Sequence, residues 1–162
     1  MDDTLAQAAT PSARIDIDEL PGNAIRRLQQ IAVAIFLQEA HSHGVTPVQF
    51  AVLQALANEP GVDQRSLART LGFDTSTIAG VIDRLEGRGA VARQVDPSDR
   101  RVRRLSLTED GEALLADVVP AMRRTQSRIL APLPPAEQAE FMRLLQVLVR
   151  ENNALSRAPS DR

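Results

Sequence analysis

The sequence predicts a mainly α-helical fold with one small β-hairpin. Apolar residues make up 43% of the 162 residues, which is enough to form a core. Most of the chain spaces these residues at the three- and four-residue intervals of amphipathic helices. Between Ala90 and Leu107 the pattern changes to alternation around a polar turn, which indicates two short strands.

Four helices are expected before the alternating segment, over residues 24–40, 47–58, 63–71 and 77–88. Pro21-Gly22-Asn23 marks the start of the first helix, and Gly44 follows its end. Thr46 followed by Pro47 is a strong start signal for the second. Asp74, Thr75 and Ser76 are N-cap candidates for the fourth helix.

The alternating segment is expected to form strands over residues 90–95 and 102–107, joined by the polar turn Asp96–Arg101. Thr108 then caps a helix that reaches Leu130, with a kink expected near Pro120. A last helix covers residues 136–151. The predicted order is therefore four helices, a hairpin and two further helices.

The charged residues are unevenly distributed along the chain. The net charge is −2, but residues 65–104 hold nine Arg and five acidic residues, a local charge of +4. The remainder holds ten Arg and sixteen acidic residues, a local charge of −6. A basic segment on an acidic body is typical of a protein that presents one face to a polyanion.

Composition excludes several function classes. The absence of cysteine excludes disulfides and thiolate metal sites, and two histidines alone predict neither a metal site nor a cofactor. The sequence has no nucleophile motif and no glycine-rich phosphate loop, so an enzyme is not expected. The longest apolar run, Ile31–Leu37, is too short to span a bilayer, and the acidic N-terminus does not read as a secretory signal, so we expect a cytoplasmic protein.

Two short helices around a tight turn, followed by a basic hairpin, are the order of a winged helix-turn-helix. The major groove admits one helix, and small or polar residues at its start allow close approach. Thr75, Ser76 and Thr77 meet this need, and Arg84 could reach a phosphate or a base. The alternative is that these hydroxyl residues only cap the helix.

At the hairpin turn, Asp99, Arg100 and Arg101 form a charged tip. A tip arginine can enter the narrow minor groove, where the negative potential is strongest, and Asp99 could hold such a side chain extended. The alternative is an ordinary solvated turn.

The chain resembles the MarR family of bacterial regulators from Pro21 to Glu151. The most specific part of the resemblance lies between Val62 and Gly111. It consists of Asp83-Arg84-Leu85-Glu86, Gly89, Asp96-Pro97-Ser98-Asp99-Arg100-Arg101 and Leu107-Thr108-Glu109-Asp110-Gly111.

This resemblance implies a homodimer whose first and last two helices form the interface, and whose paired recognition helices enter successive major grooves of a pseudo-palindrome. It implies DNA contacts by Thr75, Ser76, Thr77 and Arg84, and a minor-groove contact by Arg101 with Asp99 as its support. Arg65 and Arg100 complete the set of DNA-binding candidates.

The composition of the two ends, together with the resemblance, predicts an organisation along the chain. A flexible arm (1–20) precedes a dimerisation helix (21–45) and a winged helix-turn-helix DNA-binding domain (46–107). C-terminal dimerisation helices (108–152) and a flexible tail (153–162) follow.

Many members of this family release DNA when a small aromatic acid or phenol binds. We therefore expect a repressor of a catabolic or efflux operon, released by an effector such as a hydroxybenzoate or a hydroxylated pyridine carboxylate. The ligand-binding candidates are Phe36, His41, His43, Gln49 and Phe50. Alternatively the two Phe are ordinary core and the two His a solvated helix end.

The absence of Cys excludes the peroxide-sensing branch of the family, and the absence of Trp disfavours the urate-responsive branch. An activator, a regulator without a ligand and a protein-interaction module stay open as alternative functions.

Overall fold

The computed structural model describes residues 15–156 and 158–160, so the predicted arm lies outside the described residues over positions 1–14. The described part is mainly α-helical with one small sheet. Its elements are η1 (Ile17–Glu19), α1 (Pro21–Glu39), η2 (His41–His43), α2 (Pro47–Asn58), β1 (Val62–Asp63), α3 (Gln64–Leu71), α4 (Thr75–Gly87), β2 (Val91–Val95), β3 (Arg103–Leu107), α5 (Glu109–Leu130), α6 (Pro135–Glu151) and η3 (Asn153–Leu155).

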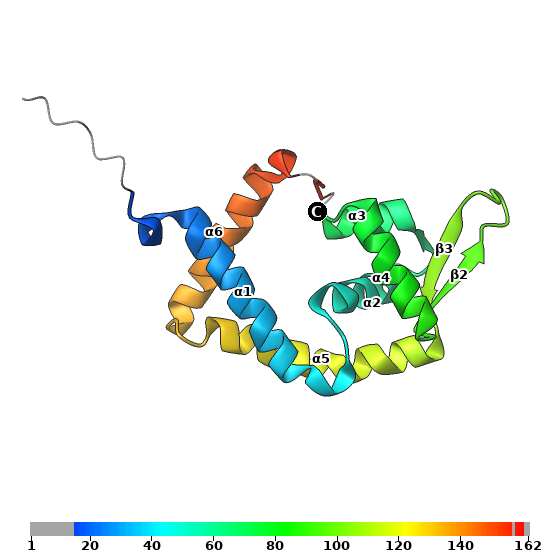
Figure 1. Ribbon diagram of the computed structural model, residues 1–162, viewed down its shortest axis with the longest axis horizontal. Coiled ribbons are helices and arrows are strands. Elements are labelled where there is room, and N and C mark those ends of the chain that lie inside the picture. The colour runs from blue at the N-terminus through cyan, green and yellow to red at the C-terminus, as the bar shows by residue number, and fades with distance from the viewer. Residues whose placement is uncertain (1–14, 157, 161–162) are drawn as a thin grey trace, which may run out of the picture.

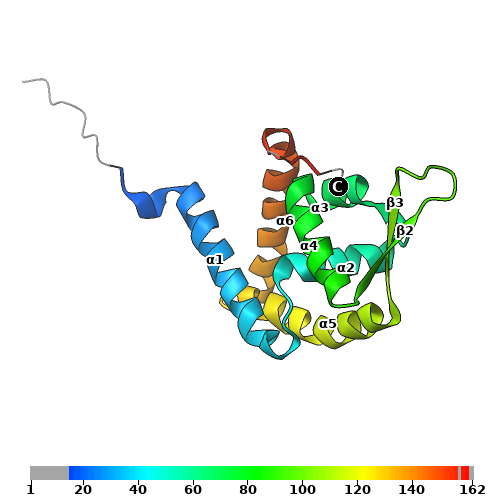
Figure 2. The ribbon, with the colours of Figure 1, turned by 45° about the vertical axis from the view of Figure 1, so that its right-hand side comes forward.

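The helices form two groups joined by one long helix. In Figure 1, α1 and α6 lie at one end of the molecule and α2, α3, α4 and the hairpin at the other. Helix α5 runs along one side and connects the two groups. Figure 2 shows that the tip of the hairpin projects beyond the neighbouring helices. No helix within the described ranges is both long and apolar enough to cross a membrane.

Side-chain caps explain how the chain forms two helices separated by a tight turn. The Asp63 carboxylate accepts hydrogen bonds from the main-chain N–H groups of Arg65 and Ser66 and so starts α3. Gly72, with φ +67°, ends it in the left-handed conformation that glycine favours. Asp74 then caps α4, which begins at Thr75 rather than at Thr77 as predicted, because Asp74 and not a later residue is the cap.

The predicted hairpin is confirmed, and the structure adds a third strand to it. The strand order is β1-β3-β2, with antiparallel pairing of Val62 with Leu105 and of Val91 with Leu107. Strand β1 has two residues, too few to show any alternation in the sequence. Its pairing places the start of α3 directly beside the hairpin.

Two buried clusters hold the helices in place. The larger joins α2, α3, α4 and the sheet, and its fully buried members include Leu53, Leu56, Ile82 and Leu105. The smaller joins α1 to α5 through Phe36, Ala40, Val45, Val118 and Ala121.

Helix α6 has no buried residue, and apolar side chains of α1 and α6 are exposed on the protomer. These exposed side chains are Ile25, Ile31, Leu37, Met142, Leu144, Leu148 and Val149. Large exposed apolar surfaces are a feature of proteins that associate with a partner or a second copy.

The described part of the tail lies against the end of α3. The Ser160 hydroxyl donates to the Thr70 carbonyl at 3.1 Å, and Asn153 exchanges two hydrogen bonds with Ser160.

Helix α5 runs unbroken from Glu109 to Leu130 with Pro120 inside it.

Candidate nucleic-acid interface and ligand site

A broad hollow lies where the starts of α3 and α4 meet the hairpin. It has a volume of about 580 Å³. Its lining residues are Asp63, Gln64, Arg65, Ser66, Thr75, Arg101, Val102 and Arg103. Three predicted DNA contacts, Arg65, Thr75 and Arg101, are therefore brought to one place from three elements. All three side chains belong to exposed residues.

The start of α4 is organised around Asp74. Its carboxylate accepts hydrogen bonds from the Ser76 hydroxyl (2.6 Å), the Thr77 hydroxyl (2.6 Å) and the Thr77 main-chain N–H (2.7 Å). These hydrogen bonds hold the pKa of Asp74 well below its usual range, and the hydrogen bond from Ser76 has the largest effect. Ser76 and Thr77 therefore serve the cap, yet both stay exposed and their hydroxyl oxygens can still accept.

Arg84 is exposed on the same helix but does not line the hollow. Its guanidinium lies along α4, since a Cβ built at Gly80 would be 3.7 Å from Arg84 Nη1. Arg84 therefore lies farther along α4 than the residues that line the hollow.

Gln64 and Arg103 also line the hollow, although we did not predict them as site residues. The Gln64 amide donates to the Thr75 carbonyl at 3.5 Å and links the starts of α3 and α4. Arg103 donates to the Arg100 carbonyl at 2.9 Å. The sequence signal for Gln64 was its position in the first turn of a helix, after Asp63. The signal for Arg103 was its place on the alternating strand.

The hairpin tip is stabilised through its main chain. The Asp99 carboxylate accepts a hydrogen bond from the Arg101 main-chain N–H at 3.0 Å. Asp99 therefore supports the loop backbone, whereas the sequence suggested a contact with the Arg101 guanidinium. Arg100 and Arg101 are both exposed at this tip.

Asp96 anchors the base of the turn and was not among the predicted site residues. It is 6% exposed, and its carboxylate accepts from the Ser98 main-chain N–H at 2.7 Å and from Arg104 Nε at 2.6 Å. The hydrogen bonds from Ser98, and then from Arg104, hold its pKa well below the usual range. Arg104 also donates to the Gly61 carbonyl at 3.1 Å, which ties the turn to the segment before α3.

Arg93 on β2 joins the hairpin to α4. Its guanidinium donates to both Asp83 and Glu86 on α4. The hydrogen bond to Asp83 is the main reason that the pKa of Arg93 is raised. This clamp, together with the Arg104 contacts, gives the hairpin and α4 a defined relative orientation.

The predicted ligand residues do not gather in one pocket. Phe36 and Phe50 pack in a tilted arrangement, with ring centroids 6.4 Å apart and an interplanar angle of 56°. Gln49 is buried, and its side-chain oxygen accepts from the Thr46 main-chain N–H at 2.9 Å as part of a capping box. His41 is exposed, with Nδ1 3.1 Å from the Gln38 carbonyl, and His43 is half-buried.

Of these five residues, Phe36 lines a hollow of about 130 Å³ between α1 and α5. Val33, Met122 and Ile129 supply apolar walls, and Gln29 and Gln126 supply amide groups. An apolar slot with a few polar groups is the usual form of a small-molecule site.

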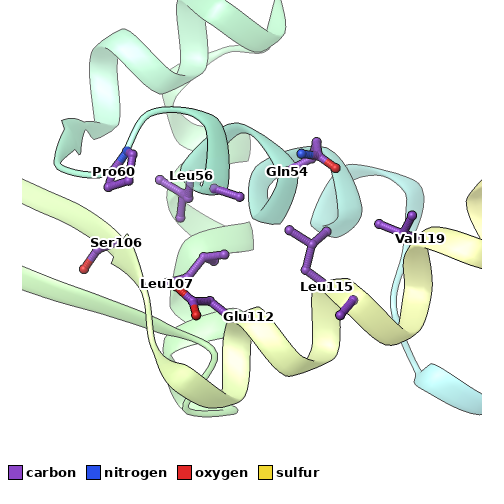
Figure 3. Close-up of a pocket in the computed structure, with 10 residues that line it drawn as sticks. Gln54, Leu56, Pro60, Ser106, Leu107, Glu112, Leu115 and Val119 are labelled. Atoms are coloured by element: carbon purple, nitrogen blue, oxygen red, sulfur yellow. The ribbon is translucent and has the colours of Figure 1, made fainter.

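A separate hollow of about 390 Å³ lies between α2, β3 and α5 (Figure 3). Leu56, Leu115 and Val119 form its apolar wall, and Gln54 and Glu112 stand at its edge. None of the predicted ligand residues lines it.

Comparison with known proteins finds relatives that are transcriptional regulators. A model of the MarR family matches residues 45–102. The HTH-type transcriptional repressor NicR of Pseudomonas putida is 32% identical over 146 residues, which cover 90% of this chain and 92% of that protein. The matched family segment runs from the start of α2 to the hairpin turn and so includes most of the residues that line the hollow.

Two solved structures are similar over most of the chain. The transcriptional repressor CouR of Rhodococcus jostii RHA1, bound to a 23-mer DNA duplex, is 32% identical with a TM-score of 0.78, covering 85% of this chain and 99% of that chain. Bordetella bronchiseptica BpsR, whose DNA binding is regulated by 6-hydroxynicotinic acid, is 33% identical with a TM-score of 0.79, covering 83% and 96%.

Proposed function

The chain belongs to the MarR family of transcriptional regulators, and from this premise we propose that it is a homodimeric repressor that binds a pseudo-palindromic operator. Members of this family are DNA-binding regulators and not enzymes, so we assign the exposed arginines at the hollow and the hairpin tip to DNA recognition. In this proposal α4 enters the major groove and the hairpin tip the adjacent minor groove.

The observation that carries the proposal is the hollow shared by Arg65, Thr75 and Arg101. It faces outward between the two elements that a winged helix-turn-helix presents to a duplex. Thr75, Ser76 and Thr77 stand at the start of α4 for base contacts, with Arg84 farther along. Arg65 and Arg100 supply phosphate contacts and Arg101 the minor-groove contact.

The proposed dimer is formed by residues 21–45 and 108–152, and residues 46–107 form the DNA-binding lobe. The exposed apolar surface of α1 and α6 supports this division, because pairing with a second copy would remove it from water. The dimer places two copies of α4 about one helical turn of DNA apart.

The proposed effector is a small aromatic acid, with a hydroxybenzoate or a hydroxylated pyridine carboxylate as the nearest models. The likeness to the regulator that responds to 6-hydroxynicotinic acid supports this class. We place the effector beside Phe36, at the hollow between α1 and α5. Phe50 packs against Phe36, but Phe50, His41, His43 and Gln49 do not line this hollow. The apolar wall of this hollow and the amide groups of Gln29 and Gln126 suit a small ring with a polar substituent.

The test is a DNA-binding titration of the full chain by fluorescence anisotropy, with a labelled duplex from the region upstream of its own gene and a scrambled duplex. The proposal expects a steep loss of affinity as salt rises, because phosphate contacts release counterions. Adding 6-hydroxynicotinate or 4-hydroxybenzoate should weaken the complex. Equal affinity for both duplexes contradicts operator recognition, and binding unaffected by every single-ring acid contradicts the effector class.

A further inference from the structure

The C-terminal end of α4 is tied to the turn between α1 and α2 by one side chain. Arg88 is the C-cap residue of α4. Its Nη1 donates to the Gly44 carbonyl at 2.7 Å, and its Nη2 donates to the His43 carbonyl at 3.1 Å. The planar guanidinium of an arginine can donate to two successive carbonyl groups in a fixed geometry. The ammonium group of a lysine acts as a point charge and does not impose this geometry.

The turn that Arg88 holds is itself firmly placed. Gly44 has φ +59°, a conformation that other residues rarely adopt, so the path of the turn depends on this glycine. Val45, which follows, is 3% exposed and packs in the cluster that joins α1 to α5.

The helix before the turn is also fixed to α5. The Glu39 carboxylate accepts from Arg124 Nε at 2.7 Å and from Arg128 Nη1 at 2.8 Å. The α1–α2 turn therefore belongs to the α1–α5 frame, and Arg88 connects that frame to the recognition helix.

We propose that Arg88 is a positioning residue for DNA recognition, which sets the angle of α4 by holding its far end against the α1–α2 turn. The inference rests on the proposed function. Helix α4 has 13 residues, about 20 Å at 1.5 Å per residue, so a tilt of about 10° at Arg88 moves Thr75 by about 3 Å. Such a shift is as long as a hydrogen bond and is enough to break base contacts.

The same contact gives the effector a route to the recognition helix. Val45, which directly follows Gly44, packs in the same buried cluster as Phe36, and Phe36 lines the α1–α5 hollow, so filling this hollow would displace the turn. A displaced turn pulls the two carbonyls from Arg88 and releases α4 without any contact between effector and DNA-reading residues.

The test compares wild type, Arg88→Ala and Arg88→Lys on a duplex selected from a random pool by the wild-type protein. Arg123→Ala is the control for the loss of one positive charge, since Arg123 is an exposed arginine on α5 that lines none of the hollows described above. Sedimentation velocity first establishes that this variant keeps the oligomeric state of the wild type. Three duplexes are used. One has the selected half-site spacing, one has a base pair added at the centre, and one has a base pair removed there.

Wild type should prefer the selected spacing, and Arg88→Ala should lose roughly tenfold in affinity on it while losing much less on the altered duplexes. The slope of log affinity against log salt should stay at the wild-type value, because Arg88 does not neutralise a phosphate. The affinity of Arg88→Lys for the selected duplex should lie between those of wild type and Arg88→Ala. In the absence of DNA, amide hydrogen exchange in the last turn of α4 should be faster in Arg88→Ala than in wild type.

A salt slope that falls by about one in Arg88→Ala would identify an ordinary phosphate contact and overturn the inference. An affinity and spacing preference equal to those of Arg123→Ala would overturn it as well. Failure of the wild-type protein to select any duplex would instead remove the proposed function, and this inference with it, so the two failures are distinguishable.

Discussion

Thr75, the first residue of α4, and Arg101, in the turn of the hairpin, line the same hollow. Two sets of contacts bring them together. The β1–β3 pairing puts the start of α3 beside the hairpin, and Arg93 joins β2 to Asp83 and Glu86 of α4. The start of α4 and the hairpin tip therefore lie on one face of the molecule. In the proposed function α4 enters the major groove and Arg101 the minor groove from this face.

Replacement of the tip arginine should weaken DNA binding strongly. Arg101→Ala is expected to cost about 1–3 kcal/mol of binding free energy, the value of one well-placed groove contact. Anisotropy titrations on the upstream duplex measure this, with Arg123→Ala as the control for loss of one positive charge. Equal affinities of the two variants would place Arg101 away from the DNA.

Replacement of Arg65 should have a different signature. Arg65 follows the Asp63 cap in the first turn of α3 and is exposed, and we propose that it contacts a phosphate. Arg65→Ala should weaken binding to all duplexes to a similar degree and lower the salt slope by about one. A selective loss on the operator alone would instead assign Arg65 to base recognition.

Gly111 should tolerate no side chain. A Cβ at this position would lie 1.9 Å from the Ala90 main-chain oxygen, where helix α5 begins against the start of the hairpin. Gly111→Ala is therefore expected to lower the free energy of unfolding by about 3 kcal/mol or more.

Urea denaturation followed by circular dichroism measures this loss. Gly87→Ala is the control, because a Cβ at Gly87 meets nothing within 4 Å and its φ is not positive. It should be neutral or slightly stabilising. Similar stability of the two variants would contradict the close packing of α5 on the hairpin.

The hairpin turn should respond to acid through Asp96. Its pKa is lowered in the folded state by hydrogen bonds from Ser98 and Arg104. Its contribution to stability is therefore fully present above the unfolded pKa of 3.8 and is lost as the pH falls toward the lower, folded value.

Asp96→Asn removes this contribution at neutral pH. The difference in thermal midpoint between wild type and Asp96→Asn should be largest between pH 5 and 7 on the ordinary carboxyl scale and shrink below about pH 4. A difference that stays constant down to pH 3 would mean that the Asp96 carboxylate contributes little to the folded state.

The exposed apolar surface of α6 should be needed for dimerisation. Leu148 is 54% exposed on the protomer, so Leu148→Asp leaves the protomer core intact but places an unpaired charge in the proposed interface. Sedimentation velocity should show a dimer for wild type and a monomer for this variant. Gln146→Asp adds the same charge at an exposed polar residue of α6 and should remain dimeric unless α6 pairs over a different face.

Much of this fold follows from local signals. The Thr46–Pro47 start, the Gly72 end and the change to alternation after Ala90 each act within a few residues, and the structure confirms the elements they predict. The start of α4 was predicted two residues late because three successive residues, Asp74 to Ser76, can all serve as caps.

Long-range contacts were not predictable in the same way. Strand β1 is too short for periodicity, and the contacts of Arg88 and Arg93 depend on which elements lie side by side. Gln49 shows the limit for ligand residues, since a capping glutamine and a ligand-binding glutamine have the same sequence signal until the hydrogen bond to Thr46 is seen.

The central claim is that α4 and the hairpin of each protomer bind the same stretch of duplex. The chain has no cysteine, so Ser76→Cys and Arg100→Cys each introduce a single site for an iron–chelate cleavage reagent. The account predicts cuts from position 76 in the major groove and from position 100 in the adjacent minor groove of the same half-site. Each pattern should repeat about 10 base pairs away in mirror image. Cuts from one position alone, or from the two positions at unrelated places on the duplex, would contradict it.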